Sequence, residues 1–252
     1  MAARYKLGLS TVQKLLDQHV FPKLFPYQQI KPQSIYLVID AYYRKRGDGT
    51  IIFRAVNLQV NLLWRDIGSE TIADYLWGVE LLEKAGYKIL GIIIDGRRGV
   101  LMALEPHAPV QYCQFHQIKT ATKYLTKKPK TEAGRALRRI ALALTKIDQG
   151  LYDRLLARWH FHYGELIKEK TKHPTGGWSY THKSIRSCYY SMIHNSAYLF
   201  TYREHPCMSN TTNSLDGSIS HLRTLHRIHR GTRLTRRLNF TEGVLRGIST
   251  II

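Results

Sequence analysis

The hydrophobic and polar positions of this chain follow two patterns, which change near residue 115. Between residues 34 and 113, short apolar runs are separated by turn-forming residues, a pattern typical of strands with short helices between them. Between His116 and Phe200, apolar residues recur at helical spacing and the strand pattern vanishes. The two patterns predict an α/β sheet followed by a helical region.

The first region divides further at its turn residues. Gly47 to Thr50 (GDGT) predicts a hairpin turn between the first two strands, Ser69 is a candidate helix cap, and Gly86 a helix stop. Three hairpin-type strands followed by helix-linked strands indicate a mixed α/β sheet. The predicted elements are strands at 34–46, 51–57 and 61–69, a helix at 69–86, a strand at 87–96, a short helix at 97–105 and a strand at 108–113.

The flanking regions are less regular. Residues 8–20 predict a short helix, which is either the remnant of a helix-turn-helix or a plain packing helix, and three prolines then indicate a linker up to residue 33. In the helical region, Pro174, Gly176 and Gly177 predict a break.

The charge balance changes the picture. The chain has 38 Lys and Arg against 18 Asp and Glu, a net charge of +20. Such an excess favours a polyanionic partner, with nucleic acid first, an anionic membrane second and a ribosomal-type structural role as the plain alternative. The sequence shows no apolar stretch of membrane-spanning length, no secretory signal and only three cysteines, so we expect a cytoplasmic protein that does not bind membranes.

The basic residues are concentrated in two segments. Residues 116–146 hold nine Lys or Arg and a single acid, Glu132. The run from His221 to Arg237 holds six Arg and three His with no acid. Without acids to pair them, the basic residues of this second run favour phosphate contacts over a solvated helix face.

Two aspartates stand at the ends of apolar strands. Asp40 follows "IYLVI" and Asp95 follows "GIII". Carboxylates in buried β-structure are costly unless they are paired or bind a metal, and Mg²⁺ prefers such oxygen ligands. The alternative for Asp95 is a helix cap or an ion pair with the adjacent Arg97 and Arg98. Asp216 is the candidate third acid, although its position also suits a helix-capping residue.

These residues resemble a known family in their order along the chain. Asp40 in "LVIDAYYRK", Asp95 in "GIIIDGRRGV", the "CQFH" of Cys113 to His116, and "NTTNSLDG" with the following "LR…HRG" resemble the bacterial Mutator-like insertion-sequence transposases. The resemblance spans roughly residues 35 to 240. It implies a ribonuclease-H-like core interrupted by an all-helical insertion.

The resemblance also implies the chemistry. Asp40, Asp95 and Asp216 would be the catalytic acids and would bind two Mg²⁺ or Mn²⁺ ions. The partner would be double-stranded DNA, both the transposon ends and the target, cut by a homodimer or larger synaptic complex at the bacterial nucleoid. The implied parts are an N-terminal helical segment at 1–33, the first part of the core at 34–116, a basic helical insertion at 117–205, and a catalytic helix with a basic C-terminal region at 206–252.

Two departures from the family leave alternatives open. The third acid is Asp rather than the usual Glu, and Glu204 is its alternative. The segment before the core is shorter than in the family, which favours a truncated copy. The competing functions are therefore a catalytically inactive DNA-binding remnant and an RNA-cleaving nuclease with the same core.

The remaining candidates concern DNA contacts. The "CQFH" spacing also occurs in zinc sites, which His205 and Cys207 would have to complete. For Trp159 a core position is favoured, whereas the glycines before Trp178 predict an exposed loop position where it could stack on a base. The predicted DNA-binding residues are Arg97, Arg98, His116, Lys119, Trp178, Arg223, Arg227 and Arg230.

Overall fold

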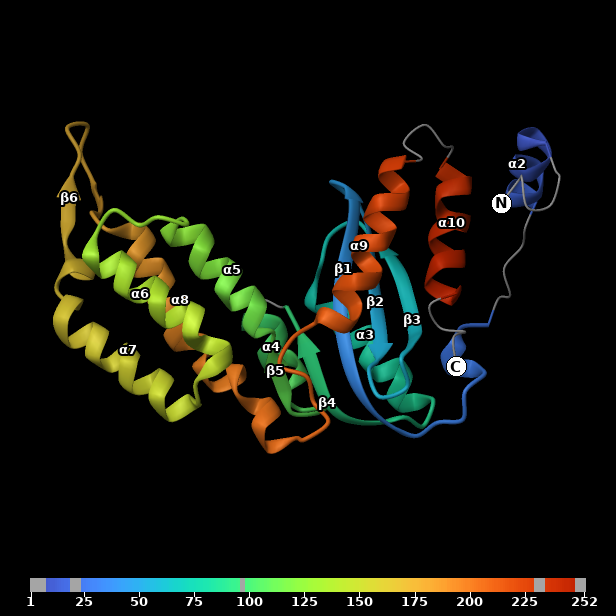
Figure 1. The fold of residues 1–252 in the computed structure, drawn as a ribbon, viewed down its shortest axis with the longest axis horizontal. Helices are drawn as coiled ribbons and strands as arrows, with labels where there is room; N and C mark the ends of the chain where they lie inside the picture. The colour runs from blue at the N-terminus through green and yellow to red at the C-terminus, as the bar shows by residue number, and fades with distance from the viewer. Residues whose placement is uncertain (1–7, 19–23, 96–97, 229–233, 248–252) are drawn as a thin grey trace. The chain divides into compact units, whose positions relative to one another are not determined.

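The structure is a computed structural model that describes residues 8–18, 24–95, 98–228 and 234–247 (Figure 1). The chain divides into two compact units, each described here by itself. The first unit comprises residues 1–92 and 213–252, and the second comprises residues 93–212. The first unit is therefore built from two separate stretches of sequence.

The first unit consists of β-strands and the helices that pack on them. Its elements are α2 (Leu9–Gln18), the 3₁₀ turn η1 (Pro26–Gln28), β1 (Ser34–Lys45), β2 (Asp48–Ala55), β3 (Val60–Ile67), α3 (Ile72–Lys84), most of β4 (Lys88–Ile94), α9 (Asn213–Ile228) and α10 (Leu234–Gly247). The predicted N-terminal helix is confirmed as α2. The stretch YKLGLS at residues 5–10, which resembles the turn of a helix-turn-helix, lies partly outside the described part of the chain.

The sheet has the strand order β3-β2-β1-β4-β5, with β5 at Val110–Tyr112. β1, β2 and β3 form an antiparallel meander, in which Asp40 lies opposite Ile52. The first residues of β1 and β4 lie together, because the Lys88 amide donates to the Gln33 carbonyl (3.2 Å), so these two strands run in the same direction. The prediction of a mixed α/β sheet is confirmed.

Helix α3 packs on the sheet, and its closest approach is at Gly78. Gly78 of α3 lies directly against the ring of Phe53, which is fully buried on β2. Gly86 ends the helix region as predicted, with a positive φ of +92° that favours glycine. The predicted cap, Ser69, is wrong. Thr71 is the cap, because its hydroxyl accepts from the Asp74 amide while the Asp74 carboxylate accepts from the Thr71 amide.

The C-terminal helices belong to the same unit. α9 packs against β1, with Leu215, Ile219 and Leu222 fully buried at i, i+4 and i+7. α10 is tied to the sheet by a buried polar chain: Arg54 on β2 donates to Asn61 on β3 (3.0 Å), and Asn61 donates to the Leu245 carbonyl (3.0 Å). These contacts bring α9 and α10 back to the sheet.

The second unit is mainly helical. Its elements are the end of β4, α4 (Arg98–Leu104), β5, α5 (Gln114–Leu125), α6 (Glu132–Ala143), η2 (Leu144–Lys146), α7 (Gln149–Tyr163), η3 (Leu166–Lys168), β6 (Lys170–Lys172), β7 (Trp178–Tyr180), α8 (Lys183–Leu199) and η4 (Thr201–Glu204). The predicted helical insertion at 117–205 lies wholly within this unit, where α5, α6, α7 and α8 pack on one another. None of the described helices is both long and apolar enough to cross a bilayer.

One part of the helical region differs from the prediction. The segment predicted as a simple break contains the antiparallel ribbon of β6 and β7, in which Lys172 pairs with Trp178. Gly176 and Gly177 form its turn with φ of +88° and +83°. All three residues of β6 are exposed, so no apolar alternation marked this strand in the sequence.

Candidate active site

Asp40 lies on the face of β1 that α9 covers. Successive side chains of a strand point to opposite faces, so Asp40, Tyr42 and Arg44 share one face. Tyr42 stacks on His226 of α9, with ring centroids 5.8 Å apart. The carboxylate of Asp40 is half-buried, and its Oδ1 accepts from the Ala41 amide (2.8 Å). The Asp40 carboxylate thus lies on the face of β1 that packs against α9, the helix that carries Asp216.

Asp216 lies in the first turn of α9 and is also half-buried. It is seven residues before Arg223, hence on the same side of the helix. The Arg223 guanidinium lies 5.8 Å from the centre of the Tyr42 ring. At this helix end the unpaired amides favour a negative charge, which accounts for an acid next to the buried Leu215.

The two carboxylates approach from facing elements. β1 and α9 run in the same direction, side by side (Figure 1). From the Tyr42–Arg223 contact, Asp40 lies about 7 Å back along the strand, and Asp216 lies about 10 Å back along the helix. Both acids therefore lie on the same side of that contact. The structure thus places two predicted site residues, far apart in the sequence, on two elements that pack together.

Asp95, the other predicted acid at a strand end, belongs to the second unit and directly follows β4. Its Oδ2 lies 3.0 Å from Nε2 of His116, which is in the first turn of α5. The Lys119 ammonium is 3.5 Å from the same imidazole nitrogen and 4.6 Å from the centre of the Phe115 ring. Asp95 thus pairs with a histidine that the sequence also singled out.

The position of His116 follows from the strand ends. The Cys113 amide donates to the Ile94 carbonyl (2.8 Å), so α5 starts next to the end of β4. Cys113 is fully buried, and both the amide and the hydroxyl of Thr212 donate to its sulfur (3.4 and 3.5 Å). Burial raises the pKa of the Cys113 thiol, which favours its neutral form. Cys113 packs, as predicted, while His116 points to Asp95.

Neighbouring groups keep Asp95 in a partly apolar setting. Burial raises the pKa of Tyr112 to about 12, and the negative charge of Asp95 adds to that rise. Tyr112 therefore stays a neutral phenol at physiological pH. The side chain of Asp95 is 36% exposed and that of His116 is 15% exposed, so the pair can be reached from solvent through the carboxylate.

The chemistry of the acids suits a hard divalent cation. Mg²⁺ is usually held by one or two carboxylates, with waters and substrate phosphates completing six oxygens. Asp40 and Asp216 offer two half-buried carboxylates of this kind. Within the described ranges, no three or more His, Cys, Asp or Glu side chains are grouped closely enough to hold a metal ion. Neither the three predicted acids nor the zinc set of Cys113, His116, His205 and Cys207 forms such a group, so both metal sites stay predictions.

The alternative third acid lies elsewhere. Glu204 ends η4 in the second unit and is exposed. Asp216 shares the first unit with Asp40. Glu204 shares the second unit with Asp95, so the choice of Asp216 over Glu204 stays a prediction.

The predicted DNA-binding residues are distributed over both units. Arg223 and Arg227 are exposed on α9, and Lys119 is exposed on α5. Arg97 and Arg230 lie outside the described residues, and Arg98 begins α4 with an undescribed side chain. Two residues that the sequence did not single out, Arg44 and Arg237, line a pocket with Arg223 and Arg227. The signal for Arg237 was its place in the acid-free run, but its distance from Arg44 along the chain hid the pairing.

Trp178 is exposed, but on a strand rather than in a loop. It begins β7, its side chain is 53% exposed, and the Lys170 ammonium lies 3.9 Å from its ring centre. The prediction of a loop is wrong because the glycines form the turn just before it. The β6–β7 ribbon presents this indole beside Lys170 and Lys172, with Arg186 stacked on Tyr180 (3.9 Å) at its base.

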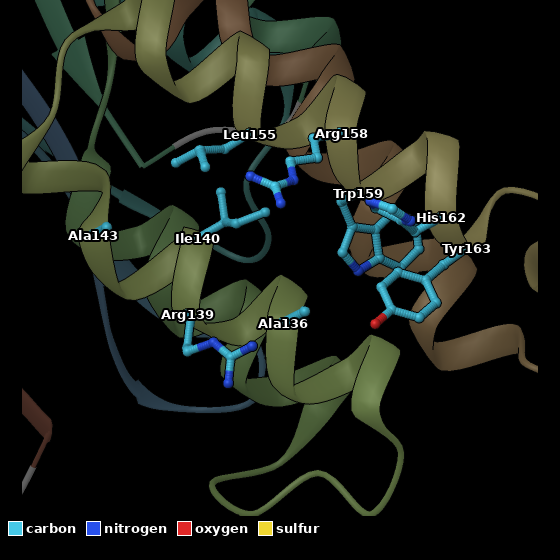
Figure 2. Close-up of a pocket in the computed structure, with 9 residues that line it drawn as sticks. All are labelled: Ala136, Arg139, Ile140, Ala143, Leu155, Arg158, Trp159, His162 and Tyr163. Carbon is cyan, nitrogen blue, oxygen red and sulfur yellow. The ribbon is translucent and has the colours of Figure 1, made fainter.

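A second hollow lies between α6 and α7 (Figure 2). Its volume is about 540 Å³, and Arg139, Arg158 and His162 contribute its basic groups. Trp159 reaches only its wall, because the indole is 3% exposed and its N–H donates to the Ala133 carbonyl (2.9 Å). The core role favoured for Trp159 is confirmed.

Comparison with known proteins adds no relative. No protein-family model matches the chain, and no curated protein matches its sequence.

Proposed function

We propose that the chain is a DNA transposase that uses divalent metal ions to cleave and join DNA strands. Asp40, Asp95 and Asp216 are its catalytic acids. The observation that supports the proposal is the position of Asp40 on β1 and of Asp216 in the first turn of α9, two elements that pack together. Two carboxylates brought from distant segments to one face are a costly arrangement unless a cation offsets their repulsion.

The fold supports the proposal at a coarser level. A three-stranded antiparallel meander, followed by helix-linked strands and a returning helix with an acid, is consistent with a ribonuclease-H-like core. Asp95 follows β4, the neighbour of β1 in the strand order. The basic helical region of the second unit then corresponds to the insertion that the resemblance implies.

The chain's own residues would act as follows. Asp40, Asp95 and Asp216 would hold Mg²⁺ or Mn²⁺, which supplies Lewis-acid activation of water and of the scissile phosphate when bound. His116 fixes the orientation of the Asp95 carboxylate through the 3.0 Å contact. Lys119, Arg223, Arg227 and the β6–β7 ribbon supply positive charge for the DNA backbone. The substrates would be double-stranded transposon ends and target DNA in the bacterial nucleoid, held by a dimer or larger synaptic complex.

A plasmid-nicking assay tests the proposal. Purified protein is incubated with supercoiled plasmid and Mn²⁺, Mg²⁺ or EDTA, and relaxation is followed on gels. Asp40→Asn, Asp95→Asn and Asp216→Asn should each lower metal-dependent nicking by at least about 100-fold, because an amide cannot replace a charged metal ligand. The matched control is Glu204→Gln, which removes an exposed acid of the second unit and should nick like wild type.

Three other outcomes separate the alternatives. Nicking that Glu204→Gln abolishes and Asp216→Asn leaves intact would move the third acid to Glu204. DNA binding without any metal-dependent nicking would leave the chain as a DNA-binding remnant. Faster cleavage of an RNA–DNA hybrid than of duplex DNA would assign an RNA-cleaving nuclease instead.

A further inference from the structure

A small basic pocket opens at the far end of the strand that carries Asp40. Its volume is about 280 Å³, below the range of about 300–1,000 Å³ typical of sites for drug-sized ligands. It is lined by the end of β1, by α9 and by the start of α10. Its principal residues are Tyr42, Arg44, Arg223, His226, Arg227 and Arg237.

The positive charge of the pocket is mostly uncompensated. Arg44 is neutralised, because its guanidinium pairs with Asp48 (2.6 Å) and Asp66 (3.0 Å). Arg223, Arg227 and Arg237 form no ion pair within the described residues, and the sequence has no acid from residue 217 to residue 241. Three guanidinium groups thus meet in one small space with no carboxylate of their own.

Arg237 gives a second, independent sign of a missing acceptor. Its Nε is buried and has no hydrogen-bond acceptor in the described protein. A buried donor left without an acceptor costs about 1–3 kcal/mol. The charge of Arg237 acts on Asp48, but Oδ1 of Asp48 accepts from Arg44 and Oδ2 forms no hydrogen bond with Arg237. An anion entering the pocket would satisfy Arg237.

The walls of the pocket hold the arginines in place. The Tyr42 ring stacks on His226 and also lies 5.8 Å from the Arg223 guanidinium. Nε2 of His226 lies 3.0 Å from the hydroxyl oxygen of Thr241, and that hydroxyl donates to the Arg237 carbonyl (2.9 Å). These contacts join α9 to α10, so the cationic groups are positioned before any ligand arrives.

We infer that this pocket binds one backbone phosphate of a DNA strand. Planar guanidinium forks match the paired oxygens of a phosphodiester. The inference rests on the proposed function, because it takes the phosphate to belong to the DNA whose strand lies across β1 and α9. It adds Arg237 and the start of α10 to the DNA-contacting surface.

The test measures DNA affinity without catalysis. Fluorescence anisotropy with a labelled 30-base-pair duplex is recorded in EDTA from about 50 to 400 mM KCl. Removal of one phosphate-binding cation should reduce the slope of log affinity against log salt by about 0.9, which corresponds to about fivefold weaker binding at 150 mM. Arg237→Gln, and separately the exposed pair Arg223→Gln/Arg227→Gln, should show at least this change.

Two controls make the result specific. Lys88→Gln removes the same charge at the opposite end of the sheet, where Lys88 is exposed, and should keep the wild-type slope. Arg237→Lys keeps the charge but not the planar fork, so it should keep the slope and bind more weakly. Thermal melts identify any variant that fails to fold, and the exposed double variant then carries the test.

Slopes equal to those of Lys88→Gln would overturn the inference. Binding of free phosphate alone would also overturn the inference. It would appear as a rise in melting temperature with about 20 mM inorganic phosphate that the variants lack, while their DNA-binding slopes stay at the wild-type value. The result is independent of the nicking assay. A reduced slope without any nicking would support phosphate binding in the pocket and contradict the transposase proposal. Nicking with unchanged slopes would support the transposase proposal and contradict phosphate binding in the pocket.

Discussion

At the scale of single residues, the fold depends on the absence of a side chain at Gly78 of α3. A Cβ placed there would overlap the ring of Phe53, which is fully buried on β2. The helix can approach the sheet this closely only because glycine has no side chain. Other helical glycines, such as Gly217 of α9, have open space around the same position.

We predict opposite effects of Gly→Ala at these two positions. Gly78→Ala should lower the free energy of unfolding by about 1–3 kcal/mol, the usual cost of overpacking a filled core. Gly217→Ala should raise it by up to about 1 kcal/mol, because alanine favours the helix. Urea unfolding followed by circular dichroism measures both. Equal effects of the two substitutions would show that α3 does not pack on Phe53 as described.

At the scale of elements, the start of α3 is an acid-dependent cap. Thr71 and Asp74 hydrogen-bond to each other's backbone, and Arg65 pairs with Asp74. Burial alone would raise the pKa of Asp74, but the hydrogen bonds from Thr71 and Arg65 outweigh it and lower the pKa below 3.8. The folded state therefore holds Asp74 as a carboxylate more strongly than the unfolded chain does.

We predict that this cap contributes stability only above acidic pH. A lowered folded pKa gives stability that is fully present above the unfolded value and is lost as the pH falls through the folded value. The difference in unfolding free energy between wild type and Asp74→Asn should be constant from pH 7 to about pH 5 and shrink below about pH 4. Urea titrations at each pH measure it. A difference that grows at low pH would contradict the assignment.

The elements also show what the sequence could predict. Apolar runs located β1, β2, β3, β4 and β5, because each of these strands contributes buried apolar side chains. The β6–β7 ribbon was missed because β6 is exposed throughout. Thr71 was missed as the cap although its signature was present: Asp74 stands three residues after Thr71, whereas the apolar Ile72 stands three residues after Ser69.

The candidate site was predictable only in part, for a physical reason. An acid directly after an apolar run is visible in the local sequence, so Asp40 and Asp95 could be selected from the sequence. The facing of Asp216 and Asp40 depends on α9 returning to β1, which no local pattern encodes. The contact of Asp95 with His116 likewise depends on where β4 and α5 meet. The arginine pocket was missed for the same reason.

At the scale of the whole molecule, charge dominates. The chain carries 38 basic residues against 18 acidic ones, and the +20 excess repels itself in the free folded state. The described ion pairs neutralise only a few cations, among them Arg44, Arg65 and Arg246. Salt screens such repulsion over about 10 Å at 0.1 M, while a polyanion neutralises it directly.

We therefore predict opposite salt dependences for the free and the DNA-bound chain. The melting temperature of the free chain should rise as KCl increases from about 20 to 500 mM, because screening reduces self-repulsion. A duplex added at low salt should raise the melting temperature by mass action, and this increment should vanish at high salt as binding weakens. Differential scanning fluorimetry records both curves, with neutral dextran as the control for crowding. A DNA increment that does not depend on salt would contradict an electrostatic, phosphate-directed mode of binding, because only the release of counterions ties the affinity so closely to ionic strength.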